Sequence, residues 1–174
     1  DLDTQLGPEM KSTGEVLGVS TSFREALLKG MMGAGFTLKK KGKVLISVKD
    51  SDKQEIISIA ERFAELGFEL YATPGTANVL NRHMVATNAV RNVDEPSPNM
   101  IDLIESGEMD YVITTSVKGR HPELGSVRIR RCTVEHAIPC LTAIDTASAL
   151  LRCLEGSTDI ESCELVDINT VHIQ

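Results

Sequence analysis

The order of apolar and polar positions divides the chain into short strands that alternate with helices. Runs of β-branched and aliphatic residues, typical of strands buried in a parallel sheet, lie at residues 44–48, 68–72, 85–90, 110–114 and 139–142. Between them, apolar residues recur at helical spacing, most clearly at Ile56, Ile59 and Phe63. This alternation predicts an α/β fold: a three-layer, Rossmann-like sandwich with a mostly parallel five-stranded sheet and helices on both faces.

The remaining segments predict further helices and one tight turn. Asp50 to Asp52 offer caps for the helix that contains Ile56, and Thr73-Pro74-Gly75-Thr76 predicts a turn before a short helix through Val79 and Leu80. We expect the other helices at residues 23–31, 100–105, 128–136 and 145–154.

The flanks of this pattern differ from its centre. Residues 1–18 lack periodicity and are expected to be the end of a preceding region, and residues 19–42 predict a helix followed by a lysine-rich, solvated linker. The main domain is expected at 43–156. Residues 157–174 form an acidic extension, in which Leu165 to Ile168 predict a possible edge strand.

Composition narrows the class of protein. The 174 residues suit one domain with attached tails, and 41% hydrophobic content with only 3% aromatics predicts a largely aliphatic core. Acidic residues outnumber basic ones, 25 against 18, which argues against a general nucleic-acid partner. No apolar run approaches a membrane span and no leader pattern is seen, so we expect a soluble, cytoplasmic protein without a membrane partner.

The cysteines predict neither a metal site nor disulfides. Cys132, Cys140, Cys153 and Cys163 are separated by 8, 13 and 10 residues, with no CxxC pair and no paired histidine spacing. Zinc sites need more closely spaced ligands, so we expect four reduced cysteines packed as small hydrophobic residues.

Hydroxyl-rich and cationic residues follow several predicted strands. Ligands bind beyond the carboxyl ends of parallel strands, and the amides of a helix start suit phosphate. The candidates are Ser47, Lys49 and Lys53 after the first strand, Thr73 and Thr76 after the second, and Thr114, Thr115, Ser116, Lys118 and Arg120 after the fourth. Together they predict a pocket for a small anion. Taken singly, the segment 73–76 also fits an ordinary turn with a capping threonine, and Lys53 also fits a solvated helix residue.

Catalytic signals are weaker. Of the four histidines, only His121 follows a strand end from which it could reach a pocket. No carboxylate pair or Ser-His-Asp order stands out, so we predict no catalytic residues. Arg128, Arg130 and Arg131 form a basic cluster that fits either a helix face paired with acidic neighbours or part of the anion site.

Residues 10–18 read MKSTGEVLG. This motif resembles the end of the second ATP-grasp half of the large subunit of carbamoyl phosphate synthetase. The stretches VLISVKDSDK, GFELYATPGTANVL, GEMDYVITT and VRIRRCTVEHAIPCLTA resemble its C-terminal regulatory domain, a member of the methylglyoxal synthase-like superfamily. The resemblance implies a regulatory nucleotide site and no active centre.

In that family, a lysine and two threonines hold the phosphate of a uridylate-like effector, and they match Lys53, Thr73 and Thr76. The matches to the other site positions are Ser47 and, for the family's Asn-Thr-Thr, Thr114, Thr115 and Ser116. The expected effector is UMP, with IMP and phosphoribosyl pyrophosphate as alternatives.

The sequence departs from the family at three places. Arg91-Asn92-Val93 replaces a run with a second phosphate lysine, Pro74 replaces a histidine, and Cys140 replaces the tyrosine of ornithine-responsive members. Arg91 and Asn92 therefore remain possible contacts, and an ornithine response is not expected.

The resemblance also implies a parent enzyme. This is a ligase that makes carbamoyl phosphate from glutamine or ammonia, bicarbonate and ATP with Mg or Mn, for pyrimidine and arginine biosynthesis. The implied partners of this domain are the rest of the large subunit and the glutaminase small subunit, and the domain is expected to self-associate. No cofactor is expected in this part of the enzyme. One alternative is a methylglyoxal synthase. In that enzyme a carboxylate base follows the third strand, but residues 96–99 of this chain, Pro-Ser-Pro-Asn, contain no carboxylate, and Asp94 and Asp102 nearby are poor substitutes. Another is an oligomerisation module with a vestigial pocket.

Overall fold

A computed structural model of the chain describes residues 18, 23–115 and 124–156. The chain divides into two compact units, of which the larger is Leu38–Thr158 and the smaller contains the first helix. The elements are α1 (Phe23–Gly33), β1 (Lys43–Ser47), the 3₁₀ helix η1 (Asp50–Asp52), α2 (Glu55–Glu65), β2 (Glu69–Ala72), α3 (Pro74–Arg82), β3 (Thr87–Ala89), α4 (Met100–Glu105), β4 (Tyr111–Thr114), α5 (Leu124–Glu135), β5 (Cys140–Leu141) and α6 (Ile144–Glu155).

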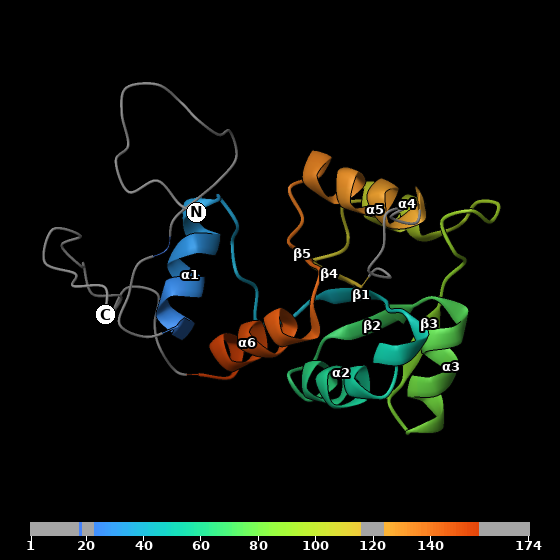
Figure 1. The fold of residues 1–174 in the computed structure, drawn as a ribbon, viewed down its shortest axis with the longest axis horizontal. Coiled ribbons are helices and arrows are strands. Elements are labelled where there is room, and N and C mark those ends of the chain that lie inside the picture. The colour runs from blue at the N-terminus through green and yellow to red at the C-terminus, as the bar shows by residue number, and fades with distance from the viewer. Residues whose placement is uncertain (1–17, 19–22, 116–123, 157–174) are drawn as a thin grey trace, which may run out of the picture. The chain divides into compact units, whose positions relative to one another are not determined.

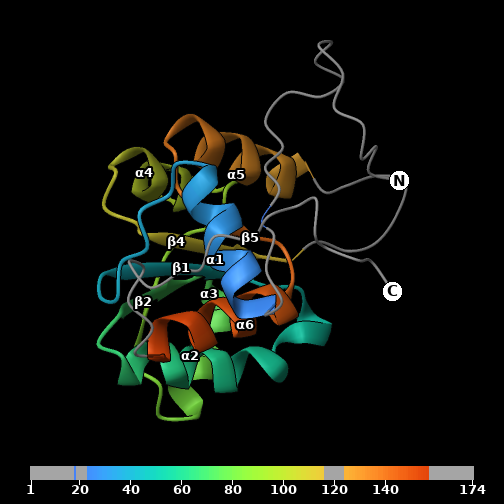
Figure 2. The same cartoon turned by 90° about the vertical axis from the view of Figure 1, so that its left-hand side faces the viewer.

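The larger unit is built on one five-stranded sheet in the order β3-β2-β1-β4-β5. All of its strand pairs are parallel. Figures 1 and 2 both show α4 and α5 on one face of the sheet and α2, α3 and α6 on the other. The predicted three-layer α/β fold is confirmed. The order of strands reverses between β1 and β4, and open α/β sheets bind ligands at such a point.

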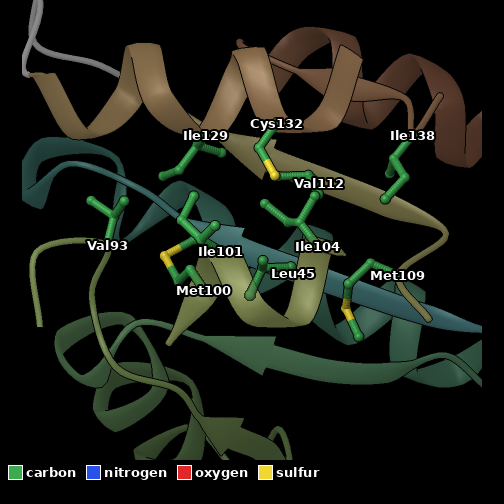
Figure 3. Close-up of a cluster of buried hydrophobic side chains, with 10 residues drawn as sticks. All are labelled: Leu45, Val93, Met100, Ile101, Ile104, Met109, Val112, Ile129, Cys132 and Ile138. Carbon is green, nitrogen blue, oxygen red and sulfur yellow. The ribbon is translucent and has the colours of Figure 1, made fainter. Parts of the chain in front are cut away.

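The core beneath α4 and α5 is aliphatic, as the composition predicts. Figure 3 shows side chains of both helices directed toward Leu45 of β1 and Val112 of β4. The buried residues of this cluster are Leu45, Val93, Met100, Ile101, Ile104, Met109, Val112, Ile129, Cys132 and Ile138. Filling this layer with branched and flexible side chains anchors the two helices on the sheet.

On the opposite face of the sheet the core contains aromatic side chains, whereas the composition predicts an aliphatic core. Phe63, Phe68 and Tyr111 are all buried there, and their ring centroids lie 5.2 to 6.3 Å apart. Phe63 and Phe68 meet edge to face, an arrangement that contributes beyond the burial of area alone. Three of the six aromatic residues of the chain therefore pack together in this half of the core.

In the segment before β1, Lys39, Lys40 and Lys41 are exposed, but the backbone is hydrogen-bonded to the start of β4. The Lys39 N–H donates to the Tyr111 hydroxyl (2.9 Å), which donates in turn to the Lys39 carbonyl (3.0 Å). Asp110 accepts hydrogen bonds from the Lys39 ammonium (2.6 Å) and the Lys43 N–H (2.8 Å). Gly42 is needed here because its φ is +148° and a Cβ would overlap the Asp110 carboxylate. Tyr111 and Asp110 thus fix this segment to the start of β4.

None of the helices in the described part of the chain has the length and apolar run that crossing a bilayer requires. Of the three described cysteines, Cys132 and Cys153 are buried and Cys140 is half-buried. Cys163, and the edge strand predicted at 165–168, lie outside the described residues.

Candidate functional site

The carboxyl ends of β1, β2 and β4 lie side by side and carry most of the predicted site residues. Ser47 ends β1 and Thr114 ends β4, and the two residues are paired in register. Thr73 directly follows β2, and its N–H donates to the carbonyl of Ile46 in β1 (3.2 Å). Ser116, Lys118 and Arg120 lie outside the described residues, as does His121. The strand ends therefore bring together Ser47, Thr73 and Thr114.

Thr115 joins the loop after β4 to the loop after β1. Its N–H donates to the Ser47 carbonyl (3.1 Å), and its hydroxyl oxygen accepts from the Lys49 N–H (3.1 Å). The Lys49 ammonium lies 3.4 Å from Asp52 Oδ1. Burial tends to raise the pKa of Asp52, but hydrogen bonds from Thr115 and Ser51 and the charge of Lys49 lower it overall. Thr115 and Asp52 thereby hold the first loop in place.

The first turn of α3 presents amides and hydroxyls to the same edge of the sheet. Thr73 is the N-cap, and its hydroxyl contacts the Thr76 hydroxyl (3.3 Å) instead of capping the helix amides. Both threonines are buried. Gly75 and Thr76 lie in the first turn, where N–H groups have no intrahelical partner and the helix dipole is positive. The predicted turn at 73–76 is therefore the start of α3, because Pro74 is suited to the first helical position.

Lys53 supplies the positive charge at this helix start. A Cβ built on Gly75 would lie 2.8 Å from Lys53 Nζ, so the ammonium group rests directly against the first turn of α3. The side chain of Lys53 is three-quarters buried, and its Nζ lies 2.5 Å from Asp50 Oδ1. We call Lys53, Thr73, Gly75 and Thr76 the α3 anion site.

The donors of the α3 anion site match the chemistry of a phosphate group. An ammonium, two hydroxyls and the amides of a helix start all favour a compact anion with several acceptor oxygens. Ser47 and Thr114 end the paired strands β1 and β4 at the same edge of the sheet. The arrangement can bind and orient such a ligand.

Comparison with known proteins decides the family. Residues 55–142 match the family model of the MGS-like domain. The chain belongs to the MGS-like domain family. It is also 46% identical, over 166 residues and 95% of its length, to the carbamoyl phosphate synthase large chain of Lachnoclostridium phytofermentans. The chain spans only 16% of the length of that relative.

A solved structure supports the fold of this MGS-like domain. The crystal structure of methylglyoxal synthase from Elizabethkingia anophelis matches 66% of this chain and 79% of its own, with a TM-score of 0.53 and 18% identity. At that identity the likeness shows a shared fold alone.

Arg91 and Asn92 of this MGS-like domain contact their own loop. Arg91 Nη1 donates to the carbonyls of Pro96 and Ser97 (3.3 Å each). Asn92 donates its N–H (2.6 Å) and its side-chain amide (3.0 Å) to the Glu95 carboxylate. Within the described part of the chain, no recorded hydrogen bond or ion pair joins either residue to the α3 anion site. Their predicted part in ligand binding stays a prediction.

Asp102, one of two carboxylates weighed as a catalytic base, has a structural partner. Its Oδ2 accepts the N–H of Asn99 (2.6 Å), while Asn99 Oδ1 accepts the N–H of Asp102 (3.4 Å) and also that of Ile101 (2.9 Å). These reciprocal bonds form a capping box at the start of α4. Asp94 is exposed in the preceding loop. In residues 18, 23–115 and 124–156, no group of three or more His, Cys, Asp or Glu side chains is placed to hold a metal.

Sequence reasoning treated Asp50 and Asp52 only as helix caps, and it placed Gly75 in the candidate turn without its contact with Lys53. The i, i+3 spacing of Asp50 and Lys53 was a usable signal, because it permits an ion pair across one turn. The approach of Gly75 to Lys53 and the contact of Asp52 with Thr115 join separate loops, so no local pattern reveals them.

Proposed function

We propose that this MGS-like domain is the regulatory domain of a carbamoyl phosphate synthase large chain and that it binds a phosphorylated effector at the α3 anion site. The observation that carries the proposal is the Lys53 ammonium group resting against Gly75, beside the buried hydroxyls of Thr73 and Thr76. The 46% identity to a carbamoyl phosphate synthase large chain supports the assignment to that enzyme.

The proposed effector is UMP, with IMP and phosphoribosyl pyrophosphate as alternatives. Lys53, Thr73 and Thr76 would hold its phosphate together with the amides of Gly75 and Thr76. The residues that would contact the nucleoside or sugar are Ser47, Thr114, Thr115 and Ser116, with Lys49, Arg91, Asn92, Lys118 and Arg120 as further candidates.

Regulation would act on chemistry that lies elsewhere in the parent enzyme. We propose that this domain carries no catalytic residue and no cofactor, and that ATP and Mg or Mn act in the rest of the large chain. An effector can change that activity only by binding one conformational state more tightly than another. Such coupling is typically worth about 1–3 kcal/mol. The glutaminase small subunit is the further proposed partner.

A calorimetric titration tests the proposal directly. The chain is titrated with UMP, IMP, phosphoribosyl pyrophosphate and inorganic phosphate, and we expect saturable binding of at least one effector. Lys53→Ala should weaken that binding about tenfold or more, because a charge-assisted contact to phosphate is lost. Lys40→Ala removes an exposed lysine of the segment before β1 and should leave the affinity unchanged. Absence of binding at millimolar ligand would overturn the site.

Two further assays separate this proposal from the alternatives. Production of methylglyoxal from dihydroxyacetone phosphate would favour the enzyme, although Asp102 is engaged in the α4 cap. Concentration-dependent self-association that no ligand changes would favour an oligomerisation module. In the whole synthase, the bound effector should change the rate of carbamoyl phosphate formation, and Lys53→Ala should remove that response.

A further inference from the structure

Lys53, the cation of the α3 anion site, already has an anionic partner within the protein. Asp50 begins η1 and Lys53 is its C-cap, so one turn of backbone separates the two residues. The Lys53 N–H donates to the Asp50 carbonyl (3.3 Å), and the side chains form an ion pair with 2.5 Å between Nζ and Oδ1. The turn itself therefore keeps a carboxylate next to the ammonium group that the proposed ligand needs.

Asp50 is held loosely compared with its neighbour Asp52. The Asp50 side chain is 94% exposed, and among the described residues its one recorded side-chain contact is the pair with Lys53. Asp52 instead accepts from Ser51 (2.9 Å), pairs with Lys49 and hydrogen-bonds Thr115. Asp50 can therefore leave its position at little cost, whereas Asp52 belongs to the framework of the loop.

A phosphate at the start of α3 would need the same ammonium group. Lys53 is only one-quarter exposed and rests against Gly75, so the space around Nζ is limited. A phosphate that binds Nζ at hydrogen-bond distance must displace the Asp50 carboxylate or share the ammonium with it. Sharing brings two anions close together, and like charges repel.

We propose that Asp50 is an internal competitor that lowers the affinity of the α3 anion site for phosphorylated effectors. In the unliganded protein it neutralises Lys53, and on binding it yields its place to the phosphate. This inference rests on the proposed function, because it takes Lys53 as a phosphate ligand. It assigns to Asp50 the role of setting the concentration range over which the effector acts.

Titration of UMP and inorganic phosphate into Asp50→Asn tests the inference. The substitution preserves size and removes the charge, so UMP should bind about two- to fivefold more tightly at low ionic strength, the range expected for an exposed ion pair. The gain should shrink in 0.5 M salt, which screens exposed charges. It should also disappear when Asp50→Asn is combined with Lys53→Ala.

Glu55→Gln is the matched control. It removes another exposed carboxylate from the start of α2, and the structure records no contact between its side chain and Lys53. It should change UMP affinity less than Asp50→Asn does. An equal gain in both variants would indicate a general charge effect and overturn the role of Asp50.

The outcomes distinguish this inference from the proposed function. Weaker binding in Lys53→Ala together with unchanged or weaker binding in Asp50→Asn would overturn the competitor role and leave the effector site in place. Weaker binding in Asp50→Asn would show that Asp50 positions Lys53 instead of competing for ligand. Absence of binding in both the wild type and Asp50→Asn would overturn both.

Discussion

Gly75 makes room for the Lys53 ammonium group at the second position of α3. A side chain there would enter the space occupied by Lys53 Nζ, with a Cβ 2.8 Å from it. The end of a lysine side chain can move aside, so the backbone has no need to shift. The absence of a side chain at residue 75 thus matters more for the proposed anion site than for the stability of the helix.

Gly75→Ala should separate binding from stability. We expect UMP affinity to fall about fivefold or more, because Lys53 is displaced and access to the first-turn amides narrows. The free energy of unfolding should stay unchanged or rise by about 0.4–1 kcal/mol, since alanine restricts the unfolded chain. Calorimetry and urea denaturation measure the two effects. Asn78→Ala, exposed one turn later in α3, should leave affinity intact, and unchanged affinity in Gly75→Ala would exclude this role.

Tyr111 gives the protein a distinct response to alkaline pH. Its ring is fully buried, and its hydroxyl both donates to and accepts from the backbone of Lys39. Burial, aided by the charge of Asp110 and opposed by the Lys39 hydrogen bond, raises the pKa of Tyr111 to about 12. The neutral phenol is therefore strongly favoured in the folded state.

Stability should decrease as the pH rises above about 10. Below this value Tyr111 is protonated in both states, but between 10 and 12 the unfolded chain loses the proton that the folded chain keeps. The total loss is roughly 2–3 kcal/mol, and urea denaturation from pH 8 upward measures its onset. Tyr111→Phe should show a shallower pH dependence and lose about 1–2 kcal/mol at neutral pH, since Lys39 loses its partner. An identical slope in Tyr111→Phe would contradict this explanation.

At the scale of elements, α2 and α6 are joined by one bidentate ion pair on the aromatic face of the sheet. Arg62 donates from Nε to Glu155 Oε1 (2.8 Å) and from Nη2 to Oε2 (2.7 Å). This hydrogen-bonded pairing raises the pKa of Arg62 and lowers the pKa of Glu155. Paired guanidinium and carboxylate planes fix the spacing of the two helices.

A double-mutant cycle measures the contribution of this pair. Arg62→Gln and Glu155→Gln, alone and together, should give a coupling free energy of about 0.5–1 kcal/mol, because both side chains are about one-third exposed to solvent. Adding 0.5 M salt should reduce the coupling. Strictly additive effects on the free energy of unfolding would show that the pair contributes no net stability.

Element positions could be predicted from sequence where the apolar pattern is long. The strands around Leu45 and Val112 and the helix of Ile56 and Phe63 were found in place, because burial on one or both faces dictates their pattern. Boundaries were less predictable. β3 is only Thr87–Ala89 although valines flank it at 85 and 90, since it is an edge strand with pairing on one side.

The first residues of helices were also difficult to predict from the sequence. The caps proposed at 50–52 form the separate 3₁₀ helix η1, and α2 begins at Glu55. α5 begins at Leu124, earlier than the apolar spacing predicted. Local hydrogen bonds and contacts with other loops decide such details, and neither leaves a periodic signal in the sequence.

At the scale of the whole sheet, the site follows from topology. Because β1, β2 and β4 are parallel neighbours, the sequence alone could predict that Ser47, Thr73 and Thr114 share one edge. The sequence could not predict that Lys53 contacts Gly75 or that the Thr115 hydroxyl accepts a hydrogen bond from the Lys49 N–H, because these contacts join loops that are distant along the chain. They depend on side-chain packing between loops.

We propose that the start of α3, with Lys53, is the phosphate-binding part of this MGS-like domain. An NMR titration of the ¹⁵N-labelled chain with UMP tests it most directly, with inorganic phosphate as the minimal probe. We predict that the largest shift changes for both ligands occur at the amides of Lys53, Gly75 and Thr76, and that Lys53→Ala suppresses them. Saturable shifts confined to other parts of the domain, or shifts at α3 that persist in Lys53→Ala, would contradict phosphate binding at the start of α3.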